Sequence, residues 1–183
     1  RTISTTADGA FDLYALDFDQ DGDVDVLSAS LYDHEITLYE NNGSQTFAPY
    51  VIATAVNGTR SVYAGDMDND GDTDIIATAL NDDQVIVYTN ETSGLATASF
   101  VASTISTTAN GARSVFAADM DNDGDMDIVS ASQEDDAIAW YENDGAANPS
   151  WTASDIATSA NGAVSLFAAD MDADGDMDIV STS

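Results

Sequence analysis

An aspartate-rich segment of eleven residues occurs four times along the chain at nearly constant spacing, and this repetition most constrains the fold. The copies read DFDQDGDVDVL from Asp17, DMDNDGDTDII from Asp66, DMDNDGDMDIV from Asp119 and DMDADGDMDIV from Asp170. Their first aspartates are 49, 53 and 51 residues apart. Self-similarity at such a period indicates an array of equivalent units rather than one irregular domain.

Short apolar stretches flank each segment and predict β-strands. A stretch such as SVFAAD precedes the segment, and MDIVSAS continues from it. A third stretch such as AIAWYEN and a fourth such as WTASDIAT follow. Four strands per unit of about 50 residues, without a helical period, are typical of a β-propeller blade. We expect the first strand of each unit to be innermost, because its alanines and glycine suit a crowded axis.

The composition excludes several classes of partner and site. The chain has 34 acidic residues and three basic ones, Arg1, Arg60 and Arg113, for a formal charge of -31. Nucleic acids and anionic membranes need a basic face, so neither is expected as a partner. Cysteine is absent, which excludes disulfides and thiolate metal sites. Uncharged apolar runs such as 75–80 are far shorter than the ~20 residues of a membrane span, so no membrane insertion is expected.

The spacing of the aspartates within each segment indicates a site for a hard metal ion. Twenty of the acids stand at positions one, three, five, seven and nine of the four loops, and a glycine stands at position six. Carboxylates at alternate positions of a tight loop converge on one point, and Ca²⁺ takes six to eight oxygen ligands. An EF-hand loop has glutamate at position twelve, whereas this chain has Ser28, Ala77, Ser130 or Ser181 there. Magnesium prefers retained waters and stricter octahedral geometry, so calcium is the expected ion.

The repeated loop and its flanking strands resemble the FG-GAP or VCBS repeats of integrin-like β-propellers, and the resemblance covers essentially the whole chain. It implies about four Ca²⁺ sites, one in each loop between the first two strands of a blade. In the third copy it implies side-chain ligands from Asp119, Asp121 and Asp123, a backbone carbonyl from Asp125 and a terminal carboxylate from Asp127. Equivalent roles are implied for Asp17, Asp19, Asp21, Asp23 and Asp25; for Asp66, Asp68, Asp70, Asp72 and Asp74; and for Asp170, Asp172, Asp174, Asp176 and Asp178.

The predicted fold is an all-β propeller of four-stranded antiparallel blades, with residues 1–183 forming one repeat domain. Such propellers usually close with seven blades, so this chain is expected to form half of a larger ring or a ring completed by oligomerisation. A dimer and a longer repeat chain both remain open. The predicted blade units are 11–54, 60–105 and 113–158, with a partial unit at 164–183 and an outer strand of a closing blade at 1–5.

The resemblance implies an extracellular or cell-surface, secreted module for adhesion or for binding a carbohydrate or protein ligand, with calcium as a structural metal. We expect no enzymatic activity, because no serine, cysteine or lysine nucleophile has an evident base partner. The alternatives are a non-catalytic self-assembling scaffold and the propeller portion of a polysaccharide-degrading enzyme.

Seven residues outside the loops also carry expectations. His34 is expected to be a solvated loop side chain. Arg60 and Arg113 share one repeat position, and pairing with nearby loop acids is favoured over binding an acidic sugar or a partner carboxylate. Aromatic residues at matched positions of the third strand are expected to contribute to blade packing rather than to form sugar platforms; they are Tyr39, Tyr88, Trp140 and Tyr141.

Overall fold

The structure is a computed structural model that describes residues 2–92 and 99–183, and it contains four antiparallel sheets. In the first three sheets, consecutive strands pair in the order of the sequence. The first sheet holds β1 (Ala10–Leu16), β2 (Asp25–Ser30), β3 (Glu35–Asn41) and β4 (Phe47–Ala53). The second holds β5 (Thr59–Gly65), β6 (Asp74–Ala79), β7 (Gln84–Asn90) and β8 (Phe100–Ser106). The third holds β9 (Ala112–Ala118), β10 (Asp127–Ser132), β11 (Ala137–Asn143) and β12 (Trp151–Ala157), and the last holds β13 (Ser165–Ala169) and β14 (Asp178–Thr182).

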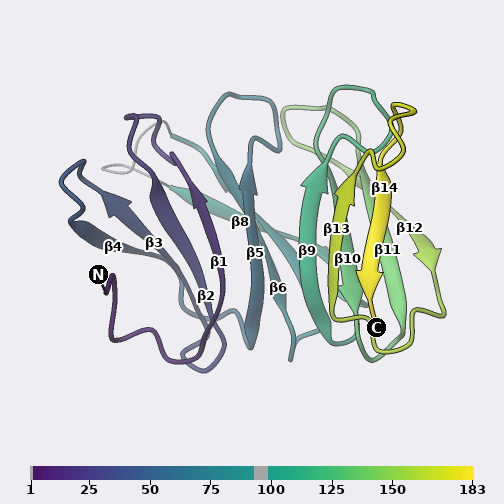
Figure 1. Cartoon of the computed structure of the whole chain (residues 1–183), viewed down its shortest axis with the longest axis horizontal. Coiled ribbons are helices and arrows are strands. Elements are labelled where there is room, and N and C mark those ends of the chain that lie inside the picture. Colours follow the sequence, from purple (N-terminus) through teal and green to yellow (C-terminus); the bar gives the residue numbers. More distant parts are fainter. Residues whose placement is uncertain (1, 93–98) are drawn as a thin grey trace.

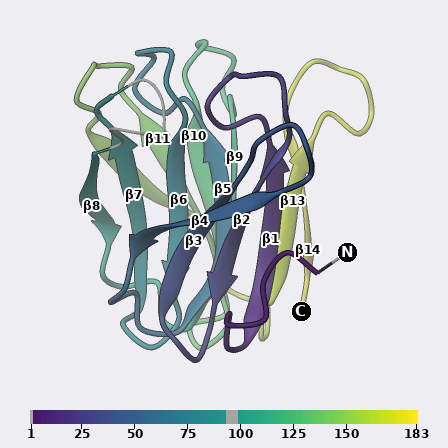
Figure 2. The ribbon, with the colours of Figure 1, turned by 90° about the vertical axis from the view of Figure 1, so that its left-hand side faces the viewer.

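The sheets stand side by side as blades around a common axis (Figure 1; Figure 2). The first strands β1, β5, β9 and β13 contact one another in series. Their aromatic residues form a column with centroids 4.7 Å apart for Tyr14 and Tyr63, 4.9 Å for Tyr63 and Phe116, and 4.9 Å for Phe116 and Phe167. The predicted propeller architecture is therefore confirmed as three four-stranded blades and a partial fourth, and the first strand of each blade is innermost.

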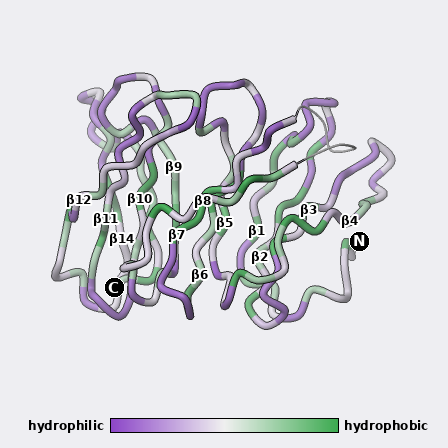
Figure 3. Tube along the Cα trace, turned by 180° about the vertical axis from the view of Figure 1, so that it is seen from behind, coloured by the Kyte–Doolittle hydropathy of each residue, from purple (hydrophilic) through white to green (hydrophobic). Residues whose placement is uncertain are grey.

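The hydrophobic cores lie between neighbouring blades rather than within one sheet. Leu27, Ile36 and Leu38 of the first blade are fully buried in a cluster that also contains Val62 and Ile75 of the second. Similar clusters join the second blade to the third and the third to the fourth. Figure 3 shows hydrophobic residues along the strands and hydrophilic residues in the loops at their ends. Burying one such aliphatic side chain stabilises the fold by about 1.5–3 kcal/mol, so neighbouring blades stabilise each other.

The residues predicted to form an outermost strand at 1–5 do not form one in this structure. Residues 2–5 lie in no strand, and residue 1 lies outside the described residues. The N-terminal segment and the two-stranded sheet lie at opposite ends of the arc (Figure 1). An outer strand needs a partner strand for its ladder hydrogen bonds, so the closing role of this segment stays a prediction.

One rim of the propeller joins successive blades through a side chain that accepts a hydrogen bond from a backbone glycine. Gly58 N–H donates to His34 Nδ1 over 2.9 Å. The equivalent bonds run from Gly111 N–H to Asp83 Oδ1 over 2.9 Å and from Gly162 N–H to Asp136 Oδ1 over 2.7 Å. The prediction that His34 is merely a solvated loop residue is therefore wrong: it is half-buried and links two blades.

The described residues include no helix long and apolar enough to cross a membrane.

Candidate metal centres

Each aspartate-rich loop forms a tight turn between the first two strands of its blade. The glycine at position six has a positive φ of 97° in Gly22, and its equivalents have values of 93°, 101° and 98°. A side chain is strained in this region of φ, which explains the glycine. The glycine N–H then donates to the first aspartate, over 3.0 Å from Gly22 to Asp17 Oδ2. The same bond recurs in the other copies at 3.0, 3.1 and 3.0 Å. The loop backbone therefore fixes the orientation of the first carboxylate.

In each loop, carboxylate oxygens of three aspartates lie within 4.8 Å of one another. Positions one and three contribute in every copy, and the third member comes from position five or position nine. The groups are Asp17, Asp19 and Asp25; Asp66, Asp68 and Asp70; Asp119, Asp121 and Asp123; and Asp170, Asp172 and Asp178.

The remaining predicted site residues lie outside these four groups. At position five these are Asp21 and Asp174, and at position nine they are Asp74 and Asp127. No side chain of position seven joins a group; these residues are Asp23, Asp72, Asp125 and Asp176. Position seven is expected to supply a backbone carbonyl, for which no particular side chain is needed. That role stays a prediction.

The aspartate at position nine links the loop of each complete blade to the third strand of that blade. Asp74 is fully buried, and its two oxygens accept N–H groups from Met67 at 2.8 Å and from Asn90 at 2.7 Å. The bonds join loop position two to the end of the third strand, and Asp25 and Asp127 make the same pair. Burial raises the pKa of Asp74 to about 7, although the two N–H bonds act in the opposite direction. From the sequence, this aspartate was assigned only as a metal ligand. The asparagine 16 residues later recurs in each complete blade, and this recurrence could have indicated the second role.

The first loop contains buried carboxylate oxygens that no described residue satisfies. Asp17 Oδ1 and Asp19 Oδ1 have no hydrogen-bond partner. Desolvation raises the pKa of Asp19, and the charges of Asp21 and Asp25 raise it further. In the second loop, desolvation and Asp70 raise the pKa of Asp68. A buried acceptor without a partner costs about 1–3 kcal/mol, so a cation among these oxygens would remove a penalty. The donor set consists of oxygen alone, which fits a hard divalent ion.

Glu40 is a further acid beside the first loop that the sequence reasoning missed. Desolvation raises its pKa, and the charges of Asp19, Asp25 and Asp21 add to the effect. Glu40 belongs to the Tyr-Glu-Asn ending of the third strand, which recurs at 141–143. The recurrence of this ending could have indicated an acid beside the loop, because the end of this strand reaches the loop.

Side-chain amides connect successive loops into one rim. At loop position four, Gln20 Nε2 donates to Gly71 O over 2.9 Å and Asn122 Nδ2 donates to Gly175 O over 3.1 Å. Asn69 Nδ2 donates to Asp125 Oδ1 over 2.5 Å. The position-four residues all have left-handed φ values near 60°. The candidate metal centres are therefore neighbours that share hydrogen bonds.

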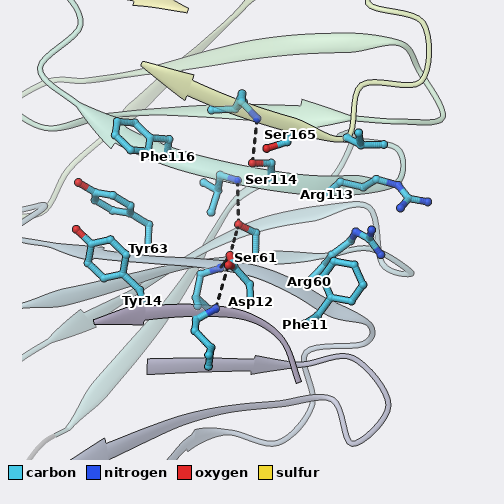
Figure 4. A pocket seen from close by; sticks show the side chains of 15 residues that line it. Phe11, Asp12, Tyr14, Arg60, Ser61, Tyr63, Arg113, Ser114, Phe116 and Ser165 are labelled. Atoms are coloured by element: carbon cyan, nitrogen blue, oxygen red, sulfur yellow. Dashed lines mark hydrogen bonds between the residues drawn. The ribbon is translucent and has the colours of Figure 1, made fainter. Parts of the chain in front are cut away.

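The two described arginines lie at the opposite end of the inner strands from the loops. Arg60 Cζ lies 3.8 Å from the centroid of the Phe11 ring, and Arg113 lies beside it (Figure 4). Neither arginine forms an ion pair with any residue in 2–92 or 99–183. The prediction that they pair with loop acids is therefore wrong, because the first strand separates the two ends.

The aromatic residues of the third strand pack within the propeller, as predicted. Tyr39, Tyr88 and Tyr141 are buried, and Tyr88 and Tyr141 belong to the first and second core clusters. Trp140 is half-buried against the third cluster. The inward position of these rings accounts for their recurrence.

The family model of the FG-GAP-like repeat matches residues 17–77, 66–130 and 120–181. Each match begins at or beside one aspartate-rich loop and ends beyond the start of the next. No curated protein matches the chain. The three family matches together cover most of the sequence, and the chain therefore belongs to the FG-GAP-like repeat family.

Proposed function

We propose that the protein is a calcium-binding β-propeller module in which Ca²⁺ is a structural metal. The observation that carries this proposal is the convergence of three carboxylates in each of four loops, with two buried oxygens unpaired in the first. An ion in each loop would join the inner strand of a blade to its second strand. The loops would then hold the propeller together rather than perform chemistry.

Calcium fits the loops better than magnesium on the basis of ligand number. Three to four carboxylates and the expected backbone carbonyl supply most of the six to eight oxygens that Ca²⁺ takes. Mg²⁺ retains several waters and is usually bound through one or two carboxylates. A dense set of carboxylates in a tight loop therefore favours the larger ion.

The expected stabilisation is large compared with the stability of a domain. A site at a calcium concentration one hundred times its dissociation constant adds about 2.7 kcal/mol. Four independent sites add about 11 kcal/mol as an upper bound. This approaches the roughly 5–15 kcal/mol by which a whole domain is usually stable.

A thermal unfolding experiment in calcium, in magnesium and in excess chelator tests the proposal. We expect the melting temperature to rise strongly with calcium and less with magnesium, and calorimetric titration to show about four ions per chain. A matched pair of variants separates ligation from general charge: Asp121→Asn removes a grouped carboxylate, whereas Asp125→Asn removes one outside the groups. Equal loss of calcium binding in the two variants, or an unchanged melting temperature in chelator, contradicts the proposal.

We also propose that the module acts outside the cell or at its surface, in adhesion or in binding a glycan or protein ligand. Calcium availability supports this location, because cytosolic free calcium would seldom fill weak sites. The module is proposed to be non-catalytic, because no serine, cysteine or lysine nucleophile has an evident base partner in the sequence. Incubation with acidic and neutral polysaccharides is the test, and depolymerisation would favour the alternative of an enzyme's propeller portion.

A second proposal concerns the two outward faces of the arc. Leu13 on β1, and Phe167 and Val180 on the last sheet, are between 47% and 62% exposed. At the positions of the second blade equivalent to Leu13 and Val180, Val62 and Ile76 are buried. We propose that further blades cover these faces, supplied by a second copy of the chain or by additional repeats. The solution mass in calcium and in chelator distinguishes a dimer from a monomer.

A further inference from the structure

The inner strands form a cleft that gathers the basic side chains of the described residues. Arg60 on β5 and Arg113 on β9 line this open cleft together with Phe11 and Asp12. Figure 4 shows the two guanidinium groups side by side at one end of the cleft, away from the aromatic column. The chain has only one other basic residue, Arg1. In a protein with a formal charge of -31, two adjacent cations in one cleft indicate a local role.

Neither guanidinium is neutralised by an acid within the described chain. Arg60 stacks on the Phe11 ring, and Arg113 Nε is buried without a hydrogen-bond partner. Burial lowers the pKa of Arg60, and the charge of Arg113 lowers it further. Two like charges held close together and an unpaired buried donor both destabilise the folded state. An anion placed between the guanidinium groups would relieve both effects.

The acid that lines the cleft is already engaged elsewhere. Asp12 Oδ2 accepts Ser61 Oγ–H over 2.9 Å and Val62 N–H over 3.1 Å, while its Oδ1 accepts Leu13 N–H over 2.9 Å. These bonds hold the carboxylate against the inner strands (Figure 4).

The acids of the loops are too distant to neutralise the arginines. Arg60 and Asp66 stand at opposite ends of one strand, which at ~3.3 Å per residue separates them by about 20 Å. Charges in salty water are screened beyond about 8 Å. The aspartate-rich loops therefore do not pair with the arginines, and the nearer acids Asp83 and Asp136 instead accept Gly111 and Gly162 N–H groups at that rim.

We propose that Arg60 and Arg113 form an anion site for a carboxylate group. A guanidinium presents N–H donors in a planar fork that matches both oxygens of a carboxylate. A carboxylate carries one negative charge, so the acidic protein opposes its approach less than that of a doubly charged phosphate or sulfate. This inference rests on the proposed role as a binding module and names the chemistry of its ligand.

The arginine Nε–H signals in a nitrogen-15 NMR spectrum test the site directly, because the chain has three arginines and no lysine. Acetate is the first probe, in calcium at constant ionic strength set with chloride. We expect the Arg113 signal to shift saturably and further than with sulfate. Equal, unsaturating shifts of all three signals, or tighter binding of sulfate than of acetate, would overturn the proposal. Glucuronate and N-acetylglycine then compare carboxylates from a sugar and from a peptide.

Substitutions separate a specific site from a general charge effect. Arg113→Gln and Arg60→Gln are each expected to weaken acetate binding about tenfold, the effect of losing one charge-assisted hydrogen bond. Arg113→Lys keeps the charge but not the fork, and an intermediate loss is expected. Thr152→Asp on the exposed outer strand β12 is the matched control, because it lowers the net charge by one as the arginine-to-glutamine variants do, and it should bind acetate as the parent does. Unchanged acetate binding in both arginine-to-glutamine variants contradicts the assignment.

Calcium-dependent melting of the same variants distinguishes a failure of the carboxylate site from a failure of the proposed function. Variants that retain calcium stabilisation are folded propellers, so lost acetate binding then reports on the cleft. Absent acetate binding together with normal calcium stabilisation would overturn the carboxylate site alone. Absent calcium stabilisation would overturn the proposed structural role of the metal.

Discussion

The second and fourth aspartate-rich loops have nearly the same sequence but different surroundings. In both, the position-six glycine donates to the first aspartate over 3.0 Å. In the second loop Met67 is 1% exposed, and Asp74 accepts two backbone N–H groups. In the fourth, Met171 is 51% exposed, and Asp178 is exposed and, among residues 2–92 and 99–183, accepts only the Met171 N–H. The turn is therefore a local property of the motif, whereas burial of its anchors depends on a third strand and on the neighbouring blades.

Metal removal should produce the largest effect and should expose the difference between these loops. In excess chelator we expect up to about 11 kcal/mol less stability for four sites. Hydrogen exchange measured with and without calcium locates the effect: amides of the second loop should lose strong protection, whereas those of the fourth should be weakly protected in both conditions. Equal protection of the two loops in calcium would show that the surroundings do not matter.

Removing the position-nine carboxylate in the absence of metal compares its structural role in the second loop with that in the fourth. Asp74→Ala leaves the Met67 and Asn90 N–H groups unpaired in a buried site, and we expect a loss of roughly 3 kcal/mol in excess chelator. Asp178→Ala should cost less than about 1 kcal/mol, because water can replace the exposed carboxylate. Urea unfolding of both variants measures the difference. Similar losses would contradict a role for the third strand.

Removing the side-chain amide that links the third and fourth loops should have a smaller effect, confined to calcium binding at the fourth loop. Asn122→Ala removes the donor to Gly175 O, the side-chain bond that reaches the fourth loop from the preceding blade. We expect a loss of about 0.5–1 kcal/mol in binding at that loop, equivalent to a few-fold weaker affinity. Calcium titration of Asn122→Ala beside Asp155→Ala, an exposed outer-strand control, measures it. An equal change at all four sites would argue against a local link.

The opposite rim provides the smallest expected effect, that of His34→Asp, because the blades there are joined alike. Gly162 N–H reaches Asp136 as Gly111 N–H reaches Asp83, so the fourth blade is as well linked there as the third. His34→Asp introduces the residue of the matched positions and should change stability by less than about 0.5 kcal/mol. His34→Ala removes the acceptor for Gly58 N–H and should cost about 1 kcal/mol. Equal melting temperatures of the two variants would contradict this role.

Much of the fold could be predicted because its signals are local and repeated. The loop spacing and the apolar stretches recur in each unit, so the blade architecture and the grouping of positions one and three could be anticipated. His34 could not be placed, because its partner Gly58 belongs to the next blade. The arginines were misassigned for a related reason: Arg60 is close to Asp66 in sequence, but an extended strand places them at opposite ends.

The sequence by itself determined the repeat, the strands and the turn of each aspartate-rich loop, since these depend on residues within one unit of about 51 residues. The tertiary structure decided which copies are buried, how the loops share hydrogen bonds, and that Arg60 and Arg113 meet in one cleft. Burial and charge depend on atoms from neighbouring blades. Four nearly identical motifs therefore acquire different environments through their places in the arc.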